Sequence, residues 1–300
     1  MEEILKVLSK KIKDEVILKC NLENITEIRI RLNKEVMVYE NNKEIILCVI
    51  STTHDITEIL KNVSNNSIYA IDGDIKEGFV TTKGGNRIGI CGEVKVSDNK
   101  IIGVSNISSM NIRIARQILG VSCKVMKYIV KNGCIKNTLI VSPPGKGKTT
   151  LLRDIARNLS DGSKDFSGVN VGIVDERNEI ASVYQGQSLL NVGKRTDVLT
   201  GINKAKGIEM MIRSMGLNVI ITDEIYTKED CEAIKKAVSS GISCIFSMHG
   251  EDLDDILMND QIADLIEGGI FKNVIILSST NRGQIQKVHI FSEKNIKEVA

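Results

Sequence analysis

The segment from Leu139 to Leu152, LIVSPPGKGKTTLL, concentrates residue types that bind phosphate. A short apolar run leads into a loop that ends in Gly147-Lys148-Thr149, and an apolar helix pattern follows. Glycines in the loop leave successive backbone N–H groups open to phosphate oxygens, because no Cβ blocks the approach. The helix that starts there adds unpaired N–H groups and a favourable dipole. The segment therefore predicts a nucleotide-phosphate cradle.

Each side chain of this loop has a predicted role. Lys148 places a full charge near the β and γ phosphates, the Thr149 hydroxyl is placed to ligate Mg²⁺, and Thr150 assists at the α phosphate. The two prolines of the chain fix φ where the loop begins. The pattern G-x-x-x-x-G-K-[ST] would have its first glycine at Ser142, so we expect the geometry to differ there. The alternative is a Gly/Pro-rich turn that only joins a strand to a helix. The predicted nucleotide-binding residues are Ser142, Pro143, Pro144, Gly145, Lys146, Gly147, Lys148, Thr149 and Thr150.

Acidic residues follow two further apolar runs. At the first, we expect Asp223 to hold Mg²⁺ through water and Glu224 to orient or deprotonate the attacking water. An acidic helix N-cap is the structural alternative. The second is Asp175-Glu176-Arg177. If its strand neighbours the loop strand, Glu176 points at the γ-phosphate, so either glutamate is a candidate for the catalytic base.

One histidine and several arginines complete the predicted catalytic set. A lone histidine is usually structural, but His249 follows a strand and can sense the γ-phosphate by a hydrogen bond that is lost on hydrolysis. Phosphoryl transfer gains from a guanidinium supplied in cis or by a neighbour. Arg195 is the preferred candidate because its Gly-flanked loop has little other reason to exist, and surface ion pairing is the alternative. The other candidate arginines are Arg113, Arg116, Arg177 and Arg213.

Two patterns divide the chain. From about residue 121, helix patterns alternate with apolar strands, which predicts a parallel sheet with right-handed crossovers and ligands at the carboxyl ends of the strands. We expect an amino-terminal α+β domain at 1–115, a connecting segment at 116–134 and a P-loop ATPase domain at 135–300. Within 121–300, the expected helices cover 122–132, 148–159, 207–215 and 227–238, and the expected strands cover 138–141, 169–174, 219–222, 242–247, 274–277 and 285–291, the last two paired through the turn Asn281-Arg282-Gly283.

The first part of the chain predicts a helix followed by β structure. Apolar residues near helical spacing favour one helix over about the first 20 residues. A helix over 55–63 follows a predicted hairpin, and Asp55 and Glu58 have the spacing of a capping box. The expected strands cover 27–32, 36–39, 45–47, 78–82, 86–91, 93–96 and 101–104, with turns at Asn41-Asn42, Gly84-Gly85 and Asp98-Asn99.

Composition narrows the class of protein. The 300 residues are 42% hydrophobic, which is enough for two cores. Their net charge of +2 lacks the excess of positive charge that is typical of proteins that bind nucleic acid. Aromatic residues make up 3% with no Trp, so platforms for base stacking are scarce. The seven cysteines are odd in number and contain no C-x-x-C pair, which is typical of reduced thiols. With no signal-peptide pattern, we expect a cytoplasmic protein that can still dock on a membrane partner.

The motifs together resemble the stage III sporulation protein AA family. The resemblance rests on SPPGKGKTTLLRD, VGIVDERNEIA, GKRTDVL, GIEMMIRSMGLNVIITDEI and SMHG, and it extends to EIRIRL and SSMNIRIARQI, so it covers nearly the whole chain. That family is similar to the ATPases of type II and type IV secretion systems, whose motor domain carries a Walker A loop, an Asp box, a Walker B segment and a His box. Here Gly147, Lys148 and Thr149 match Walker A, Asp175-Glu176-Arg177 the Asp box, Asp223-Glu224 Walker B, and His249 the His box.

This resemblance implies a RecA-like P-loop NTPase core with a parallel sheet, preceded by a smaller mixed α/β (α+β) domain. It implies ATP and Mg²⁺ as cofactors, and a homohexameric ATPase that energises a secretion-like channel during sporulation. The implied partners are the other stage III sporulation AA-to-AH proteins at the membrane, on the mother-cell side. Two alternatives stay open: a P-loop ATPase stimulated by nucleic acid, and a scaffold that binds nucleotide without turnover.

Overall fold

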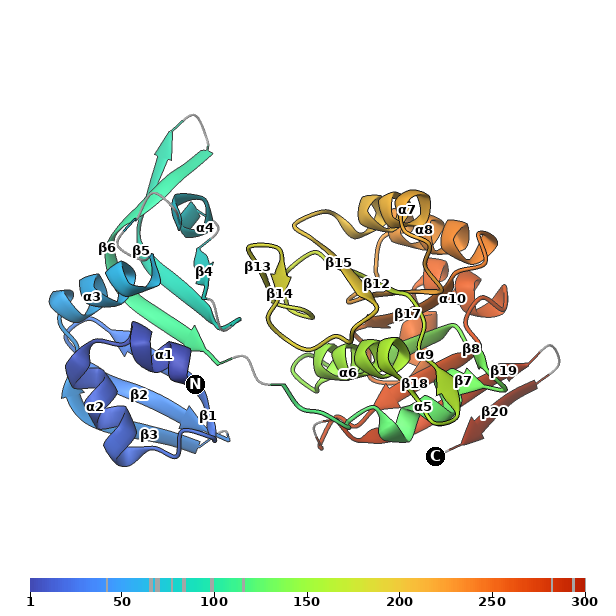
Figure 1. The fold of residues 1–300 in the computed structure, drawn as a ribbon, viewed down its shortest axis with the longest axis horizontal. Coiled ribbons are helices and arrows are strands. Elements are labelled where there is room, and N and C mark those ends of the chain that lie inside the picture. Colours follow the sequence, from blue (N-terminus) through green and yellow to red (C-terminus); the bar gives the residue numbers. More distant parts are fainter. Residues whose placement is uncertain are drawn as a thin grey trace. The chain divides into compact units, whose positions relative to one another are not determined.

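The computed structural model describes residues 1–41, 43–64, 67, 71–76, 78–82, 85–97, 100–114, 117–281, 283–292 and 295–299. Asn42, Gly84, the Asp98-Asn99 turn, Arg116 and Arg282, which carry predicted turns or a candidate arginine, lie outside these residues. Contacts divide the chain into two compact units. Unit 1 comprises Met1–Arg116 and Tyr184–Leu189, and unit 2 comprises Gln117–Val183 and Leu190–Ala300. Each unit has its own sheet and its own core (Figure 1).

Unit 1 packs helices against one face of an antiparallel sheet. In the described residues the strand order is β3-β2-β1-β6-β5-β4. Alternation makes one face of each strand apolar, as in β1, where Ile28 and Ile30 are buried in a core shared with α1, α2 and α3. The elements are α1 Glu2–Val7, α2 Lys10–Lys19, β1 Ile25–Arg31, β2 Glu35–Glu40, β3 Lys43–Ile50, α3 Thr53–Val63, α4 Asp72–Lys76, β4 Phe79–Thr81, β5 Arg87–Ser97 and β6 Lys100–Arg113.

Several predictions for unit 1 were wrong in detail. The strands expected at 86–91 and 93–96 form the single strand β5, the strand expected at 101–104 is part of the longer β6, and α4 was not predicted. The first 20 residues form two helices, because Leu8 and Ser9 are extended and the Ser9 hydroxyl donates to Asp55 Oδ1 at 2.7 Å. The capping box of α3 is Thr52 with Asp55, and Glu58 is not part of it. The Asp55 carboxylate reaches back to the Thr52 N–H at 2.7 Å, so the helix begins two residues earlier than predicted.

Unit 2 is built on a largely parallel sheet. Its described strands have the order β15-β12-β16-β17-β9-β18-β19-β20, parallel from β15 to β18 and antiparallel beyond. The helices are α5 Cys123–Ile129, α6 Lys148–Asp161, α7 Lys204–Ser214, α8 Lys228–Ser239, α9 Leu253–Leu257 and α10 Asp260–Glu267. The strands of the sheet are β9 Thr138–Val141, β12 Val171–Asp175, β15 Thr196–Thr200, β16 Val219–Thr222, β17 Ser243–Met248, β18 Asn273–Leu277, β19 Ile285–Ser292 and β20 Asn295–Val299. Short hairpins of this unit are β7 Val130–Lys131 with β8 Cys134–Ile135, and β10 Gly162–Ser163 with β11 Phe166–Ser167. A further hairpin, β13 Val183–Tyr184 with β14 Gln187–Ser188, lies almost entirely in Tyr184–Leu189, the segment that belongs to unit 1.

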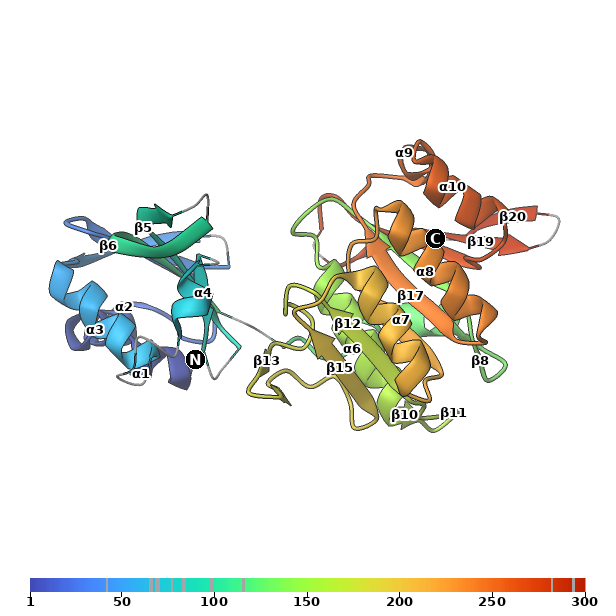
Figure 2. The ribbon, with the colours of Figure 1, turned by 90° about the horizontal axis from the view of Figure 1, so that it is seen from above.

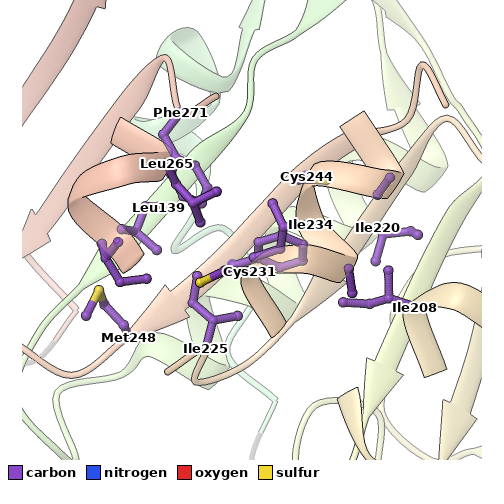
Figure 3. Packing of buried hydrophobic residues seen from close by; sticks show 14 of the residues in the cluster. Leu139, Ile208, Ile220, Ile225, Cys231, Ile234, Cys244, Met248, Leu265 and Phe271 are labelled. Carbon is purple, nitrogen blue, oxygen red and sulfur yellow. The ribbon is translucent and has the colours of Figure 1, made fainter. Parts of the chain in front are cut away.

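Helices cover both faces of this sheet. Residues of α5 and α6 share a core with Val219 and Ile221 of β16, whereas Ile220 of the same strand packs with α7, α8 and α10 (Figures 1 and 2). Figure 3 shows the second of these cores, in which Ile234 of α8 and Ile208 of α7 lie near Ile220 of β16. Burial on both faces explains why the strands read as continuous apolar runs in the sequence. Among the helices that the described residues form, none has the length and apolar composition needed to cross a bilayer.

The strand order places the site at one edge of the sheet. The loop strand β9 lies between β17 and β18. It is therefore not a neighbour of β12, because β16 and β17 separate β12 from β9. The strand β15 was not predicted, and α7 begins at Lys204 rather than at Gly207. The predicted pairing of β18 with β19 is confirmed. Because β12, β16, β17 and β9 run in the same direction, their carboxyl ends meet at a single edge.

We expect Asp55→Asn to destabilise unit 1 in a pH-dependent way. Burial alone would raise the pKa of Asp55, but hydrogen bonds from Lys11, Thr52 and Ser9 lower it to about 2. Since the folded-state pKa lies below the unfolded one, this stabilisation is present above about pH 4 and is lost as the pH falls toward 2. The substitution should cost about 2 kcal/mol at pH 7 and about half of that at pH 3.

Urea unfolding of the full chain, followed through the amide signals of α3, measures this cost. Asp14→Asn, on the exposed side of α2, is the matched control. A cost for Asp55→Asn that does not change between pH 7 and pH 3, or an equal cost for the control, would contradict the assignment.

Candidate functional site

The predicted phosphate loop joins β9 to α6 and needs glycine at two positions. Gly145 has φ of 74° and Gly147 has φ of 100°, in the left-handed region that residues with a Cβ rarely adopt. Gly147 is the N-cap of α6, so the N–H groups of the first helical turn point into the loop. The Gly283 N–H donates to the Lys146 carbonyl at 2.9 Å, which ties the loop to the turn after β18. The loop thus has the backbone geometry of an anion site.

The start of the loop explains why a serine replaces the expected first glycine. Ser142 is buried and is not among the left-handed residues, so a Cβ is tolerated there. Its hydroxyl donates to the Pro143 carbonyl at 3.0 Å. Pro143 is half-buried and Pro144 is exposed. The departure from the motif therefore lies at the buried start of the loop, before Gly145 and Gly147.

The Lys148 ammonium is buried and fully engaged. Its Nζ donates to the Ser142 carbonyl at 2.8 Å and the Pro143 carbonyl at 3.3 Å, and it lies 2.8 Å from Nδ1 of His249. These three acceptors match the three N–H bonds of an ammonium. Burial lowers the pKa of Lys148 to about 8, although the Glu224 charge opposes the shift. The cation is held in place before any phosphate arrives.

A chain of polar contacts links this lysine to the residues after β16 and β12. Nε2 of His249 lies 2.8 Å from Glu224 Oε1, and Glu224 Oε2 lies 3.4 Å from a guanidinium nitrogen of Arg177. If Nδ1 accepts from Lys148, Nε2 carries the proton and donates to Glu224, so a neutral imidazole satisfies both contacts. The structure therefore brings together Lys148, His249, Glu224 and Arg177, as strand-end reasoning predicted.

Asp223 and Thr149 fit the predicted magnesium site. Asp223 follows β16 directly and is 4% exposed, and its Oδ1 has no hydrogen-bond partner among the described residues. Burial raises the pKa of Asp223 to about 6; the charges of Asp175 and Glu224 add to the shift, and Lys204 opposes it. A buried carboxylate oxygen that lacks a partner is costly unless a cation or water reaches it. Thr149 is the second residue of α6, at the same edge of the sheet.

Asp175 organises the segment that carries Glu176. Its buried carboxylate accepts backbone N–H groups of Glu179 at 2.8 Å, Ile180 at 2.9 Å and Ala181 at 2.8 Å. Burial raises its pKa although these bonds favour the charged form. Next to it, Glu176 Oε2 forms an ion pair with Lys204 Nζ at 2.7 Å. Asp175 thus shapes the loop after β12, and Glu176 extends toward the start of α7.

Arg195 is not part of this constellation within the chain. It precedes β15, whose first residue Thr196 is in register with Val171 at the start of β12, so Arg195 lies at the opposite edge of the sheet. Its guanidinium donates to the Ser160 carbonyl near the end of α6 at 2.8 Å. The Gly-flanked segment around it therefore has a structural use that sequence reasoning missed. Arg213 is exposed in the last turn of α7, and Arg113 is exposed at the end of β6.

Two residues of the site were not predicted. Lys204 was not predicted as a site residue because neither the strand β15 nor the first turn of α7 was predicted. Asn203, a typical N-cap residue, was the available signal for the start of α7. Arg153 is buried on α6 and donates to the Glu179 carbonyl at 2.7 Å, on the loop that Asp175 shapes. Its position five residues after Lys148 gave no signal, since arginine is common on helix surfaces.

We expect Asp175→Asn to loosen the loop after β12. An amide side chain offers one acceptor oxygen where the carboxylate binds three N–H groups, so at least one of them loses its partner. Hydrogen exchange at Glu179, Ile180 and Ala181 should accelerate by about tenfold or more, which corresponds to about 1.4 kcal/mol. Asp197→Asn, exposed on the adjacent β15, is the control. Unchanged exchange at all three amides would show that Asp175 does not hold the loop.

Known proteins are similar to this chain in architecture and in sequence. Among solved structures it is similar to the ATPase DotB of Yersinia pseudotuberculosis, with a TM-score of 0.62, 12% identity and coverage of 95% of this chain and 80% of that one. It is also similar to the pilus retraction motor PilT with bound ADP, with a TM-score of 0.57, 15% identity and coverage of 92% and 78%. These similarities confirm the predicted fold class, a RecA-like P-loop core that a smaller α+β unit precedes in the sequence.

Sequence comparison gives the family. The chain is 40% identical over 280 residues to the stage III sporulation protein AA of Bacillus subtilis (strain 168), which covers 93% of this chain and 91% of that protein. The family model described as sporulation stage III, protein AA, matches residues 1–297. The chain therefore belongs to the sporulation stage III protein AA family.

Proposed function

We propose that this chain hydrolyses ATP to ADP and phosphate at the edge formed by β9, β17, β16 and β12, and that it works as a motor in a ring. The observation that carries the proposal is the contact series from Lys148 through His249 to Glu224, with both contacts at 2.8 Å. It connects a phosphate-binding cation to a carboxylate that can act on water. The ATPase DotB and the pilus retraction motor PilT, which share the fold, support the same class of activity.

The geometry suggests what each group does. In the free protein the Lys148 ammonium contacts two loop carbonyls and His249. When ATP binds, its phosphates replace some of these contacts. Thr149 directly and Asp223 through water would hold Mg²⁺, which would offset the negative charge of the phosphates. Glu224 accepts the proton as the water oxygen bonds to the γ-phosphorus and the bond to the bridging oxygen of ADP breaks. His249 orients Glu224 in this step.

We also propose an assembly and a location. The chain would form a homohexamer on the mother-cell side of a membrane channel made by other stage III sporulation AA-to-AH proteins, and would reach the membrane through them. Membership in the sporulation stage III protein AA family supports this setting. The formal net charge of +2 argues against stable binding of nucleic acid.

We expect Glu224→Gln to keep ATP binding and to lower turnover by about 10²–10⁴-fold, because the amide cannot accept the proton. Lys148→Ala should lose both ATP binding and turnover, since the phosphates lose their cation. Equilibrium binding and phosphate release under the same conditions measure the two effects. The controls are Glu232→Gln and Lys235→Ala, both exposed on α8.

Different outcomes separate the alternatives. Turnover that Glu224→Gln leaves unchanged would move the role of base to Glu176 or contradict the site. ATP binding without phosphate release, even with the partner proteins, would favour a scaffold. Salt-sensitive stimulation by single-stranded RNA or DNA would favour a nucleic-acid-dependent ATPase.

We expect ATP and Mg²⁺ to drive assembly into a hexamer. Native mass measurement with and without ATP and Mg²⁺ tests this, read beside phosphate release. Lys148→Ala, which should not bind ATP, is expected to stay in the smaller form. A mass that does not respond to ATP and Mg²⁺, or a different closed stoichiometry, would contradict the proposed ring.

A further inference from the structure

Lys204 is a buried cation at the edge of the site, and neither the family match nor the P-loop motifs assign it a role. It is the first residue of α7, directly after the N-cap Asn203, and it is 3% exposed. Its ammonium lies 2.7 Å from Glu176 Oε2 and 5.3 Å from the centre of the Tyr226 ring. Lysine is almost never buried to this extent unless it is paired. The position therefore needs the charge of Glu176.

Electrostatics at this position keep the lysine charged. Burial alone would lower the pKa of Lys204, but the hydrogen bond to Glu176 and the charges of Asp223, Glu176 and Asp230 together raise it above the ordinary value. Removing Glu176 would leave the Lys204 ammonium buried without compensation, which is strongly destabilising. Lys204 is therefore expected to stay paired with Glu176 in the folded protein.

The ion pair orients Glu176 and leaves part of it available. Glu176 follows β12, and Asp175 holds the backbone of the next residues through three N–H groups. The side chain itself is about one third exposed. Lys204 binds Oε2, and within the described residues Oε1 has no hydrogen-bond donor from the protein. A carboxylate with one oxygen anchored and the other open can accept a hydrogen bond from water in a defined direction.

We propose that Lys204 is a positioning residue, which holds Glu176 so that its second oxygen orients the attacking water beside Glu224. The proposal rests on the proposed ATPase function. It assigns separate tasks to the two glutamates: Glu176 directs the water, and Glu224 accepts its proton. Lys204 contacts neither water nor nucleotide in this arrangement and acts through Glu176.

Kinetics of four variants test the proposal. Lys204→Met should lower kcat by about tenfold or more and change the KM for ATP by less than about threefold, because an orienting group acts on the chemical step. Lys204→Arg, which keeps the charge, should recover part of the loss. Glu176→Gln should lower kcat similarly, and adding Lys204→Met to Glu176→Gln should cost little more, since the two act as a unit. Lys206→Met, exposed two residues further along α7, is the control.

The proposal is overturned if Lys204→Met keeps the wild-type kcat, if the two losses multiply in the double variant, or if Lys204→Arg is no better than Lys204→Met. Thermal unfolding of each variant shows whether it is folded. If Lys204→Met does not fold, Lys204→Gln replaces it with a side chain that is polar but uncharged.

A readout without turnover separates this proposal from the function on which it rests. In the nucleotide-free protein, Lys204→Met should accelerate hydrogen exchange at residues 176–178 by about tenfold, and Glu176→Gln should do the same. Exchange at the wild-type rate overturns the positioning role whatever the enzymatic result. If the wild type binds ATP but never releases phosphate, the proposed ATPase function fails, and the exchange data alone decide whether Lys204 fixes the Glu176 segment.

Discussion

The parallel pairing of β12, β16, β17 and β9 is the constraint on which the site depends. In register, Thr222 lies beside Val174 and Phe246, and Met248 lies beside Val141. The chain therefore leaves all four strands at one edge, and side chains 101 positions apart come within 2.8 Å of each other. Burial on both faces protects this register, since a slip by one residue would turn each apolar side chain toward the wrong layer of helices.

Most of the charges at this edge have partners within the protein. Taking an ion out of water costs several kcal/mol unless the protein replaces its partners. Asp175 receives three backbone N–H groups, Lys148 has two carbonyls and an imidazole, and Lys204 has Glu176. Asp223 differs because one of its oxygens is buried and has no partner within the described part of the chain. A hydrated cation at this position would give that oxygen a partner.

The two units bury their apolar side chains in different ways. In unit 1, helices pack on one face of an antiparallel sheet, so its strands alternate between apolar and polar residues. Asp55 joins two helices of this unit, because its carboxylate accepts from Ser9 and Lys11 near the start of α2 and from Thr52 before α3. In unit 2 the central strands β9, β12 and β16 are buried along their whole length, and the polar residues of the candidate site lie where these strands end.

Short sequence patterns predicted the features that depend on interactions between residues close together in the chain. The phosphate loop needs glycines and a helix start within a few residues, apolar runs must become buried strands, and polar residues directly after those runs must lie at strand ends. For that reason Lys148, Glu224 and His249 were predictable as site residues. The tertiary structure alone decided what depends on strand order and on contacts distant in sequence. It placed β12 away from β9, sent Arg195 to the opposite edge of the sheet, and buried Lys204 against Glu176. Such pairings follow from the packing of helices on both faces of the sheet, and no short pattern in the sequence encodes them.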